Sequence, residues 1–402
     1  MNSRTTRWLA TLALCGLGLF TFGCGGKQIP IGAVLPLTGD DDVYGIPVKN
    51  GIELAYEEIQ ADGAPLALEI VDSGSDPETA KELLRRQYDD RNALLVLGGV
   101  TSAEAREMIA VADDFDKVLL SPSASAPELS GLSRNFYRIF PSDFAAAGRM
   151  AQFVSQDLKI DEVVVIAEER QEYAKGIQGA FQSAYQGYGG SVVETLEFPP
   201  NTSDFSGFVE RVMTLNPKAV YITAYGEAVG QIIQGIRSRD YKGKILTTSA
   251  FASPRFIAPA GEAANGVILT QSVFELDSDF VHIKTFVDKY KERYGEDPDI
   301  FAAHGYDAMK VIAAAVVGRP ALPSEVPKGL RDIKDFPGVT GGIQFNDKGD
   351  VLKYPRVYII KDGVLFDYGK LVQQQQEAMK EKREELRRKL EEIQRRAKEI
   401  GG

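Results

Sequence analysis

Cysteine, histidine and tryptophan are scarce in this sequence, which holds two, two and one of them among 402 residues. Both cysteines, Cys15 and Cys24, lie near the N-terminus, so the rest of the chain has no thiol pair for a disulfide and no thiol nucleophile. His282 and His304 are isolated, and no His/Cys cluster has the spacing of metal ligands. A P-loop and a G-x-S-x-G motif are also missing. We therefore expect no metal and no cofactor, and an enzyme, which would have to rely on carboxylates, is the weakest interpretation.

Positive charge is in deficit as well, because 46 lysines and arginines face 57 acidic residues and the net charge is -11. Nucleic-acid binding depends on clustered cations, so this balance argues against it. Apolar residues make up 44% of the chain and charged residues 26%, which excludes a disordered protein. At roughly 100 to 200 residues per domain, the length indicates two domains.

Residues 1–24 have the pattern of an export signal. Two arginines precede an apolar stretch at residues 8–22, and small residues surround Cys24. The arrangement resembles a bacterial lipoprotein signal, which implies that Cys24 is lipidated and anchors the protein to a membrane in the periplasm or cell envelope. Thr21 stands where leucine is usual, so ordinary signal cleavage or an uncleaved anchor stays open. No later apolar run is long enough to span a membrane.

Short β-branched runs alternate with helical patterns from residue 29 to residue 369. The first predicted strand is Ile29 to Leu35, and the first predicted helix is Pro47 to Ala61, with Pro47 in its opening turn. The alternation begins again after Phe140, which indicates a second unit. Its predicted strands are Val163 to Ala167, Val192 to Glu197, Ala219 to Ala224, Ile245 to Thr248 and Val267 to Thr270.

Alternation of this kind is typical of parallel sheets covered by helices. We therefore predict an α/β fold with two doubly wound parallel-sheet lobes. Open α/β sheets bind ligands beyond the carboxyl ends of their strands, so a ligand cleft is expected between the lobes.

Two polar segments follow predicted strands. In the first, residues 98–104, Thr101 and Glu104 have the spacing of a helix capping box, which is the local explanation. The functional alternative is that the helix N-terminus and its hydroxyls bind a carboxylate. The second segment, Ser121 to Leu129, offers hydroxyls and carbonyls that can accept hydrogen bonds from an ammonium, although alone it is a polar loop.

Taken in order, several segments resemble the periplasmic substrate-binding proteins of the branched-chain amino acid (leucine/isoleucine/valine) ABC transporter family. The resemblance covers about Ile29 to Tyr368 and implies a type I periplasmic binding protein fold, whose two lobes are joined by a three-strand hinge and close around the ligand. The segments that show the resemblance are Ile31 to Gly39, Tyr44-Gly45, Asn50 to Ala55, Asp76-Pro77, Ser121 to Leu129, Tyr137 to Asp143, Thr202 to Ser206 and Phe345 to Asp350.

The resemblance implies a set of ligand-binding residues. Ser102 and Ser125 correspond to hydroxyls that hold the ligand carboxylate, and the Ser123 carbonyl and the Ser125 hydroxyl lie near its ammonium. Tyr44 borders the side-chain pocket, whereas Tyr173 and Tyr225 cover the ligand from the second lobe; core packing is the alternative for each tyrosine. Replacing Ser102 or Ser125 by alanine is expected to weaken binding and to leave folding nearly intact.

The chain departs from the family pattern in the second lobe. Amino-acid binders usually have an acidic residue in the segment that here reads Thr247 to Ser253. A buried ammonium without a partner charge is costly, so a standard amino acid is a less secure ligand. Glu227, in a neighbouring loop, is a candidate replacement. Ser75 and Thr101 stand where several relatives pair cysteines.

We therefore predict the following domain limits. Residues 1–24 form the signal, residues 29–139 and 272–338 form lobe 1, and residues 140–271 and 339–369 form lobe 2. The remaining residues, 370–402, are predicted to form an amphipathic helix with a net charge of +3. Apolar residues recur there every seven positions. Docking on the body, self-association and a partner helix all remain open.

The leading interpretation is a non-enzymatic, extracytoplasmic solute-binding protein. It would capture a small polar ligand, such as a branched-chain-type amino acid or a related small carboxylate, and deliver it to an ABC permease. The alternative is a ligand sensor or envelope regulatory protein that uses the same clamp and signals through its C-terminal helix.

Overall fold

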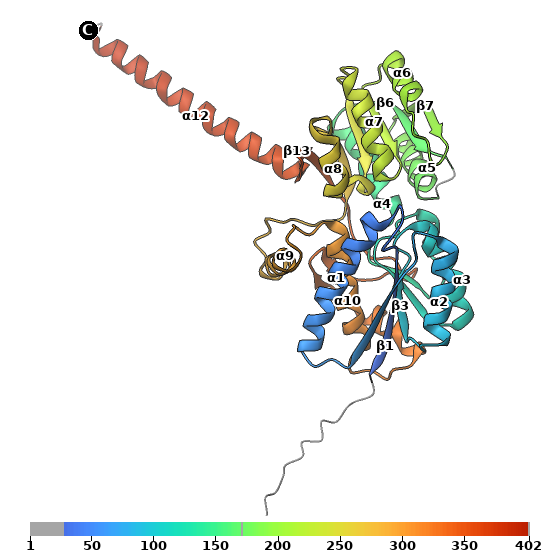
Figure 1. Ribbon diagram of the computed structural model, residues 1–402. Helices are drawn as coiled ribbons and strands as arrows, with labels where there is room; N and C mark the ends of the chain where they lie inside the picture. The colour runs from blue at the N-terminus through green and yellow to red at the C-terminus, as the bar shows by residue number, and fades with distance from the viewer. Residues whose placement is uncertain (1–27, 170–171, 401–402) are drawn as a thin grey trace, which may run out of the picture.

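A computed structural model describes residues 28–169 and 172–400. Figure 1 shows two α/β lobes, one above the other, and a long C-terminal helix that projects from the body. The predicted signal segment and Cys24 lie outside the described residues. In the part of the chain that is described, no helix combines the length and the apolar character needed to cross a bilayer.

The first lobe is built on a five-stranded sheet in the order β2-β1-β3-β4-β5. All of its pairings are parallel, and the registers place Ile31 opposite both Leu68 and Leu95. Parallel strands covered on both faces are expected to be apolar, and β3 and β4 are buried throughout. The strands are β1 (Ile29–Leu35), β2 (Leu66–Asp72), β3 (Leu95–Gly98), β4 (Val118–Ser121) and β5 (Phe136–Arg138).

Helices from two distant parts of the chain cover this sheet. Helix α1 packs against α10, and glycines permit their close approach: a Cβ on Gly305 would lie 2.3 Å from the carbonyl oxygen of Val48. The helices of this lobe are α1 (Asp42–Ala61), α2 (Pro77–Asp89), α3 (Ser102–Phe115), α9 (Val281–Tyr294), α10 (Ile300–Val316) and α11 (Val326–Asp332), with 3-10 turns η1 (Pro127–Leu129) and η5 (Pro323–Glu325).

The predicted start of the first helix was wrong. Helix α1 begins at Asp42, five residues before Pro47, and runs through the proline. The amide groups of Tyr44 and Gly45 donate to the carbonyl of Asp41, so the first turn forms without help from Pro47. As a result Tyr44 belongs to the helix and points from its N-terminal turn toward the second lobe.

The second lobe has a seven-stranded sheet in the order β14-β13-β10-β9-β8-β6-β7. Its central strands are parallel, whereas β13 pairs antiparallel with β10 and with β14. The strands are β6 (Glu162–Glu168), β7 (Ser191–Phe198), β8 (Ala219–Thr223), β9 (Lys244–Thr248), β10 (Ile268–Gln271), β13 (Arg356–Lys361) and β14 (Val364–Asp367). A separate two-stranded ribbon joins β11 (Phe336–Gly338) to β12 (Gly341–Ile343).

Helices again flank the second sheet, and α4 opens the lobe directly after residue Ser142. They are α4 (Asp143–Gln152), α5 (Glu172–Gly187), α6 (Ser206–Leu215), α7 (Gly226–Ser238) and α8 (Pro254–Ala260), with the π-helical turn η2 (Phe153–Asp157) and the 3-10 turns η3 (Ser249–Phe251) and η4 (Gly261–Ala264). The C-terminal helix α12 (Tyr368–Ile400) follows β14. The predicted α/β class, the two lobes and the C-terminal helix are confirmed.

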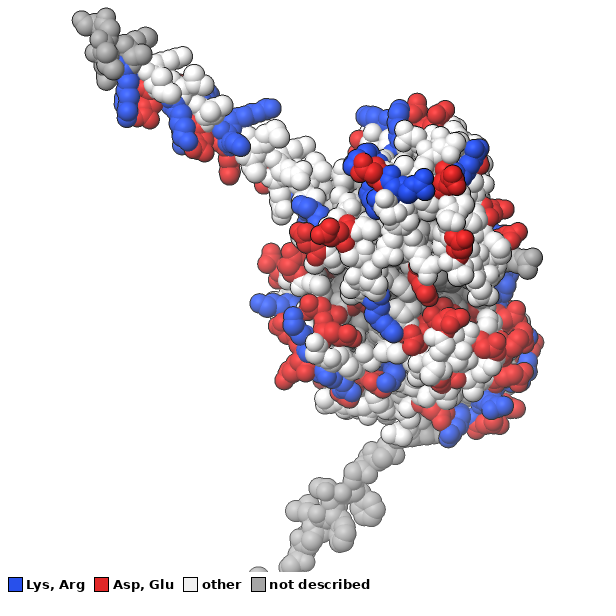
Figure 2. Space-filling view, turned by 45° about the horizontal axis from the view of Figure 1, so that its top comes forward, with Lys and Arg blue, Asp and Glu red and all other residues white. Residues whose placement is uncertain are grey.

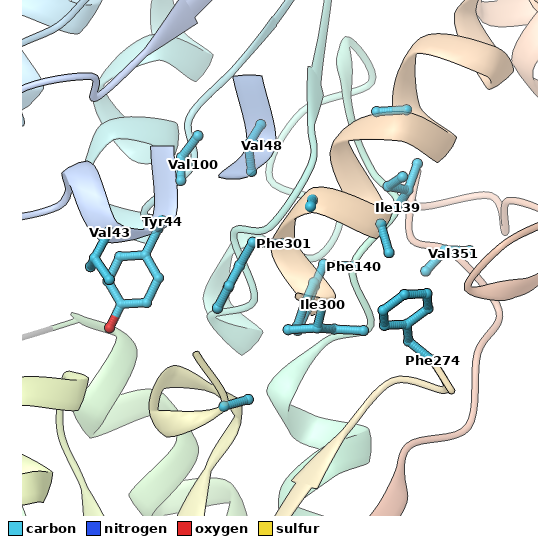
Figure 3. Close-up of a cluster of buried hydrophobic side chains, with 14 of the residues drawn as sticks. Val43, Tyr44, Val48, Val100, Ile139, Phe140, Phe274, Ile300, Phe301 and Val351 are labelled. Carbon is cyan, nitrogen blue, oxygen red and sulfur yellow. The ribbon is translucent and has the colours of Figure 1, made fainter. Parts of the chain in front are cut away.

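The chain passes between the lobes after β5, after β10 and between β12 and β13. Figure 3 labels one residue of each passage, namely Ile139, Phe274 and Val351. The first and third passages are tied by a buried ion pair, in which the Arg138 guanidinium lies 2.7 Å from the Asp350 carboxylate. The lobe limits stated above stay a prediction.

Candidate functional site

A small cavity lies between the two lobes at the carboxyl ends of their strands. Its volume is about 30 Å³. Both lobes supply its walls, so a ligand held there would be enclosed. The lining residues are Tyr44, Val100, Thr101, Ser102, Ser123, Ser125, Phe140, Tyr173, Tyr225, Ser249, Ala250 and Phe301.

The N-terminus of α3 forms one wall. The Thr101 hydroxyl caps this helix by accepting from the amide of Glu104 at 3.3 Å, as the sequence pattern predicts. Ser102 is the first residue of the helix, and its hydroxyl accepts from the amide of Ala126 at 3.1 Å. A helix N-terminus carries a partial positive charge, so this wall suits an anionic group.

The loop after β4 lies beside α3 and is fastened to it. The Ser123 hydroxyl donates to the Val100 carbonyl at 2.7 Å. Ser125 is tied to the second lobe, because its carbonyl accepts from the amide of Asp143 at 2.8 Å and its hydroxyl bonds the Asp143 carboxylate. These hydrogen bonds hold the loop in place. For Ser102 and Ser125, whose replacement by alanine was expected to leave folding nearly intact, we now predict a small loss of stability.

Two stacked tyrosines form the wall of the second lobe. The rings of Tyr173 and Tyr225 are 5.2 Å apart and nearly parallel. The Tyr173 hydroxyl donates to the Thr248 hydroxyl at 2.5 Å, and Thr248 ends strand β9. Both rings are thus fixed in place where they face the first lobe.

Tyr44 bridges the lobes. Its hydroxyl donates to the carbonyl of Ala250 and accepts from the amide of Gly226, each at 3.2 Å. In Figure 3 its side chain extends from α1 with the oxygen directed at the second lobe. Its ring lies edge-on to Phe301, at 5.0 Å between centroids. The contacts of this one side chain require the lobes to be closed.

Other contacts between the lobes agree with a closed state. A Cβ added to Gly176 on α5 would lie 2.6 Å from a carboxylate oxygen of Glu128 in the first lobe. Arg255 of α8 lies 3.4 Å from Asp42 of α1, in a partly exposed ion pair. Contacts on several sides of the cavity thus hold the two lobes together.

Buried acids surround the cavity without lining it. Burial raises the pKa of Asp143 to about 7, against the opposing effects of the Ser125 hydrogen bond and the Arg138 charge. One of its oxygens is buried without a hydrogen-bond partner. Burial also raises the pKa of Glu104 to about 7 and, with help from neighbouring carboxylates, that of Asp41 to about 6. All three carboxyl groups therefore ionise less readily than free ones.

The six residues that the sequence suggested, Tyr44, Ser102, Ser123, Ser125, Tyr173 and Tyr225, all line this cavity. Glu227 does not: it is exposed on α7 and lines a different surface hollow, so it is no substitute for the missing acid. The Thr247 to Ser253 segment contributes Ser249 and Ala250 instead.

Sequence reasoning missed the aromatic floor of the site. Phe140 and Phe301 lie side by side in Figure 3, with ring centroids 6.3 Å apart. Phe140 belongs to a segment that carried the family resemblance, whereas Phe301 is one apolar residue among many in a buried helix. Residues 28–169 and 172–400 contain no group of three His, Cys, Asp or Glu side chains arranged to hold a metal ion.

Comparison with known proteins identifies the family. The profile of the periplasmic binding protein family matches residues 28–358. The leucine-, isoleucine-, valine-, threonine- and alanine-binding protein of Pseudomonas aeruginosa is 24% identical over 362 residues, which cover 88% of this chain and 94% of that protein. The chain thus belongs to the periplasmic binding proteins, a family that functions outside the cytoplasm, and its role is to bind a solute.

Solved structures agree with this assignment. A leucine-binding protein from Thermotoga maritima is 28% identical, with a TM-score of 0.79 and coverage of 84% of this chain and 97% of that chain. A branched-chain amino acid transporter substrate-binding protein from Streptococcus pneumoniae, solved with isoleucine, is 25% identical, with a TM-score of 0.79 and coverage of 84% and 98%. A solute-binding protein from R. palustris, solved with benzoate, is 19% identical with a TM-score of 0.76, covers 85% and 95%, and shows the fold alone.

Proposed function

We propose that this protein captures a small carboxylate, either a branched-chain-type amino acid or a related acid, and delivers it to an ABC permease. The observation that carries the proposal is the closed cavity with the N-terminus of α3 and the Ser102 hydroxyl on one wall. The protein does so from the envelope side of a membrane, held by a lipid on Cys24. It acts by binding and release and catalyses no reaction.

The lining explains why a carboxylate is favoured. Amides at a helix N-terminus and serine hydroxyls donate hydrogen bonds to an anion. The aromatic rings of Phe140, Phe301 and Tyr225 supply apolar walls for the rest of the ligand. The lining therefore offers a polar wall for a carboxylate and apolar walls for the side chain of a small acid.

The cavity lining offers less for the ammonium group of an amino acid than for its carboxylate. None of the described residues that line the cavity is acidic. An unpaired buried charge costs several kcal/mol, so an α-ammonium must rely on carbonyls and hydroxyls. We therefore propose that the site accepts acids with or without the amino group.

Isothermal calorimetry on matched pairs tests this proposal, for example leucine against 4-methylpentanoic acid. The acid without the amino group should bind within about tenfold of the amino acid, or 1.4 kcal/mol. Leucinamide, which keeps the ammonium and loses the carboxylate, is the control and should bind far more weakly. A hundredfold preference for leucine over the deaminated acid would contradict the proposal that the site accepts acids without the amino group. Tighter binding of the amide would contradict the assignment of the α3 wall to the carboxylate.

Sensing is the second candidate function, and one contact favours it. Helix α12 starts at Tyr368, whose ring packs edge-on against Phe153 of the second lobe at 4.8 Å between centroids. Movement of that lobe on ligand binding would therefore carry α12 with it. Uptake of labelled ligand by cells that lack only this protein separates the two functions, since a transporter component is needed for uptake and a sensor is not.

A further inference from the structure

Helix α12 presents an apolar stripe to solvent. Its first turn packs on the second lobe, and every side chain from residue 373 to residue 396 is exposed. Figure 1 shows the helix leaving the body in a straight line. Met379, Leu386, Leu390 and Ile393 are between 51% and 64% exposed, which is unusual for large apolar side chains.

The spacing of these residues is that of a coiled-coil seam. Val372, Met379, Leu386 and Ile393 recur every seven residues, and Leu390 lies four residues after one of them and three before the next. We call these five residues the seam. Two positions that would complete it are polar, namely Gln376 and Arg383. A stripe this narrow fits the groove of one partner helix.

The positions beside the seam carry only positive or neutral side chains. We call these positions the flanks. In residues 373–396 they are occupied by Gln373, Gln375, Lys380, Lys382, Arg387, Lys389, Gln394 and Arg396. All glutamates of this stretch lie on the outer face, away from the seam. Figure 2 shows blue and red side chains along the projecting helix.

Ion pairs within α12 connect the flanks to the outer face. Lys389 lies 2.5 Å from Glu385, and Arg396 lies 2.6 Å from Glu392. Each is an exposed pair four residues apart, a type worth about 0.3–0.5 kcal/mol. Such weak pairs stabilise the helix and leave the flanking cations able to exchange partners.

The charge pattern disfavours pairing between two copies of α12. In a two-stranded coiled coil the flanks of one helix face the flanks of the other, and their charges set the choice of partner. Two copies would bring cations against cations in either orientation, and Arg383 would enter the seam twice. The same flanks are complementary to a helix with glutamate or aspartate beside its own seam.

We propose that α12 is a docking helix for an acidic amphipathic helix of a partner protein, with which it forms a two-stranded coiled coil. The seam residues pack against the partner's apolar stripe, and the flanking cations pair with its acids. Arg383 fixes the register by pairing with an acid at the facing position. An anionic membrane is the less suitable partner, because residues 370–400 contain no aromatic residue and the apolar stripe is too narrow to lie in the interface.

The test uses the purified protein and a synthetic peptide of residues 370–400 in which charges are exchanged. Four exchanges are made: Lys380 with Glu384, Arg387 with Glu391, Lys389 with Glu385 and Arg396 with Glu392. In this peptide and in its control, Arg383→Glu supplies the acid that faces Arg383 of the protein. Relative to the control, this exchanged peptide keeps the composition, the net charge and the internal ion pairs, but it places acids on the flanks. The parental peptide with the same Arg383→Glu change is the matched control. In fluorescence anisotropy the exchanged peptide should bind the protein at least tenfold more tightly than the parental peptide.

Two double variants of the protein localise the effect. Arg387→Glu with Arg396→Glu reverses flanking charges and should weaken binding of the exchanged peptide at least tenfold. Arg388→Glu with Arg395→Glu makes the same change of net charge on the outer face and should leave binding within twofold.

Other results would overturn the proposal. If the two peptides bound equally well, or if neither bound, the flanks would not determine which helix α12 recognises. A concentration-dependent dimer in sedimentation that is lost on truncating α12 would indicate self-association instead. Binding to phosphatidylglycerol vesicles but not to phosphatidylcholine vesicles, weakened equally by both double variants, would indicate a membrane surface.

Discussion

The hydroxyl of Ser102 has two roles that separate experimentally. It lines the cavity, and it also accepts from the buried amide of Ala126. Ser102→Ala should weaken ligand binding by about 1–3 kcal/mol, because the ligand carboxylate loses a hydrogen bond. It should also lower the free energy of unfolding by about 1 kcal/mol, because the Ala126 amide loses its acceptor. Calorimetry and urea unfolding measure the two effects. Ser183→Ala, at an exposed position of α5, is the control and should change neither. Normal affinity in the Ser102 variant would leave only the structural role.

Asp143 links stability to pH. Its folded pKa of about 7 lies above the ordinary value of 3.8, so the folded state binds a proton more tightly than the unfolded state does. Burial of the carboxylate is therefore destabilising above about pH 7, and this penalty disappears as the pH falls toward 4. Asp143→Asn should raise the free energy of unfolding at pH 8 by about 1–3 kcal/mol and make its pH dependence flatter between pH 4 and 8.

Urea unfolding across that pH range measures the effect, and Asp277→Asn, at an exposed position, is the control. The difference between wild type and the Asp143 variant should change by no more than about 1.4 kcal/mol per pH unit, the limit for one proton. An unchanged pH profile in the Asp143 variant would show that this group does not titrate in the range.

At the residue scale, the sequence identified polar groups better than apolar ones. Ser102 and Ser125 follow strands in recognisable segments, so the sequence could predict that they lie close together. Phe301 could not be, because an apolar residue in a buried helix has the same pattern whether it faces the core or the cavity. The partnership of Ser125 with Asp143 was also invisible, since it depends on where the first passage between lobes places α4.

Helix α12 is separable from the binding body. Beyond its first turns it is exposed, so ending the chain after Val372 should move the melting temperature by less than about 2 °C and ligand affinity by less than twofold. The matched control ends the chain after Lys361 and also removes β14, which pairs with β13 along four residues. That shorter chain should melt several degrees lower in calorimetry. Equal losses in both chains would mean that α12 supports the body.

At the element scale, the sequence pattern located the strands that we predicted in both lobes, and tertiary contacts decided features that no local pattern contains. The β13–β14 hairpin follows from Asp362 and Gly363, both of which adopt positive φ in the turn. The early start of α1 does not follow from the pattern, because Pro47 is a typical first-turn residue. The order of strands within each sheet was likewise not encoded in any local pattern and depends on the crossover connections.

For the whole molecule, the proposed function depends on closure of the lobes, and Tyr44 carries two of the hydrogen bonds that connect them. Its hydroxyl contacts Ala250 and Gly226, both in the second lobe. When the lobes separate, water can satisfy all of these groups. Removing the hydroxyl therefore destabilises the closed state relative to the open one and leaves each lobe intact.

Tyr44→Phe keeps the ring packing and removes only those two bonds, at about 1–2 kcal/mol in total. Since the ligand binds fully only in the closed state, the dissociation constant should rise about 5- to 30-fold, and the ligand-free protein should show a larger radius of gyration in solution scattering. Tyr56→Phe is the matched control, because the Tyr56 hydroxyl donates to the Leu66 carbonyl within the first lobe. It should lower the free energy of unfolding by about 1 kcal/mol without changing affinity. If Tyr44→Phe instead behaved like Tyr56→Phe, with reduced stability and unchanged affinity, the hydroxyl would serve the fold and closure would depend on other contacts.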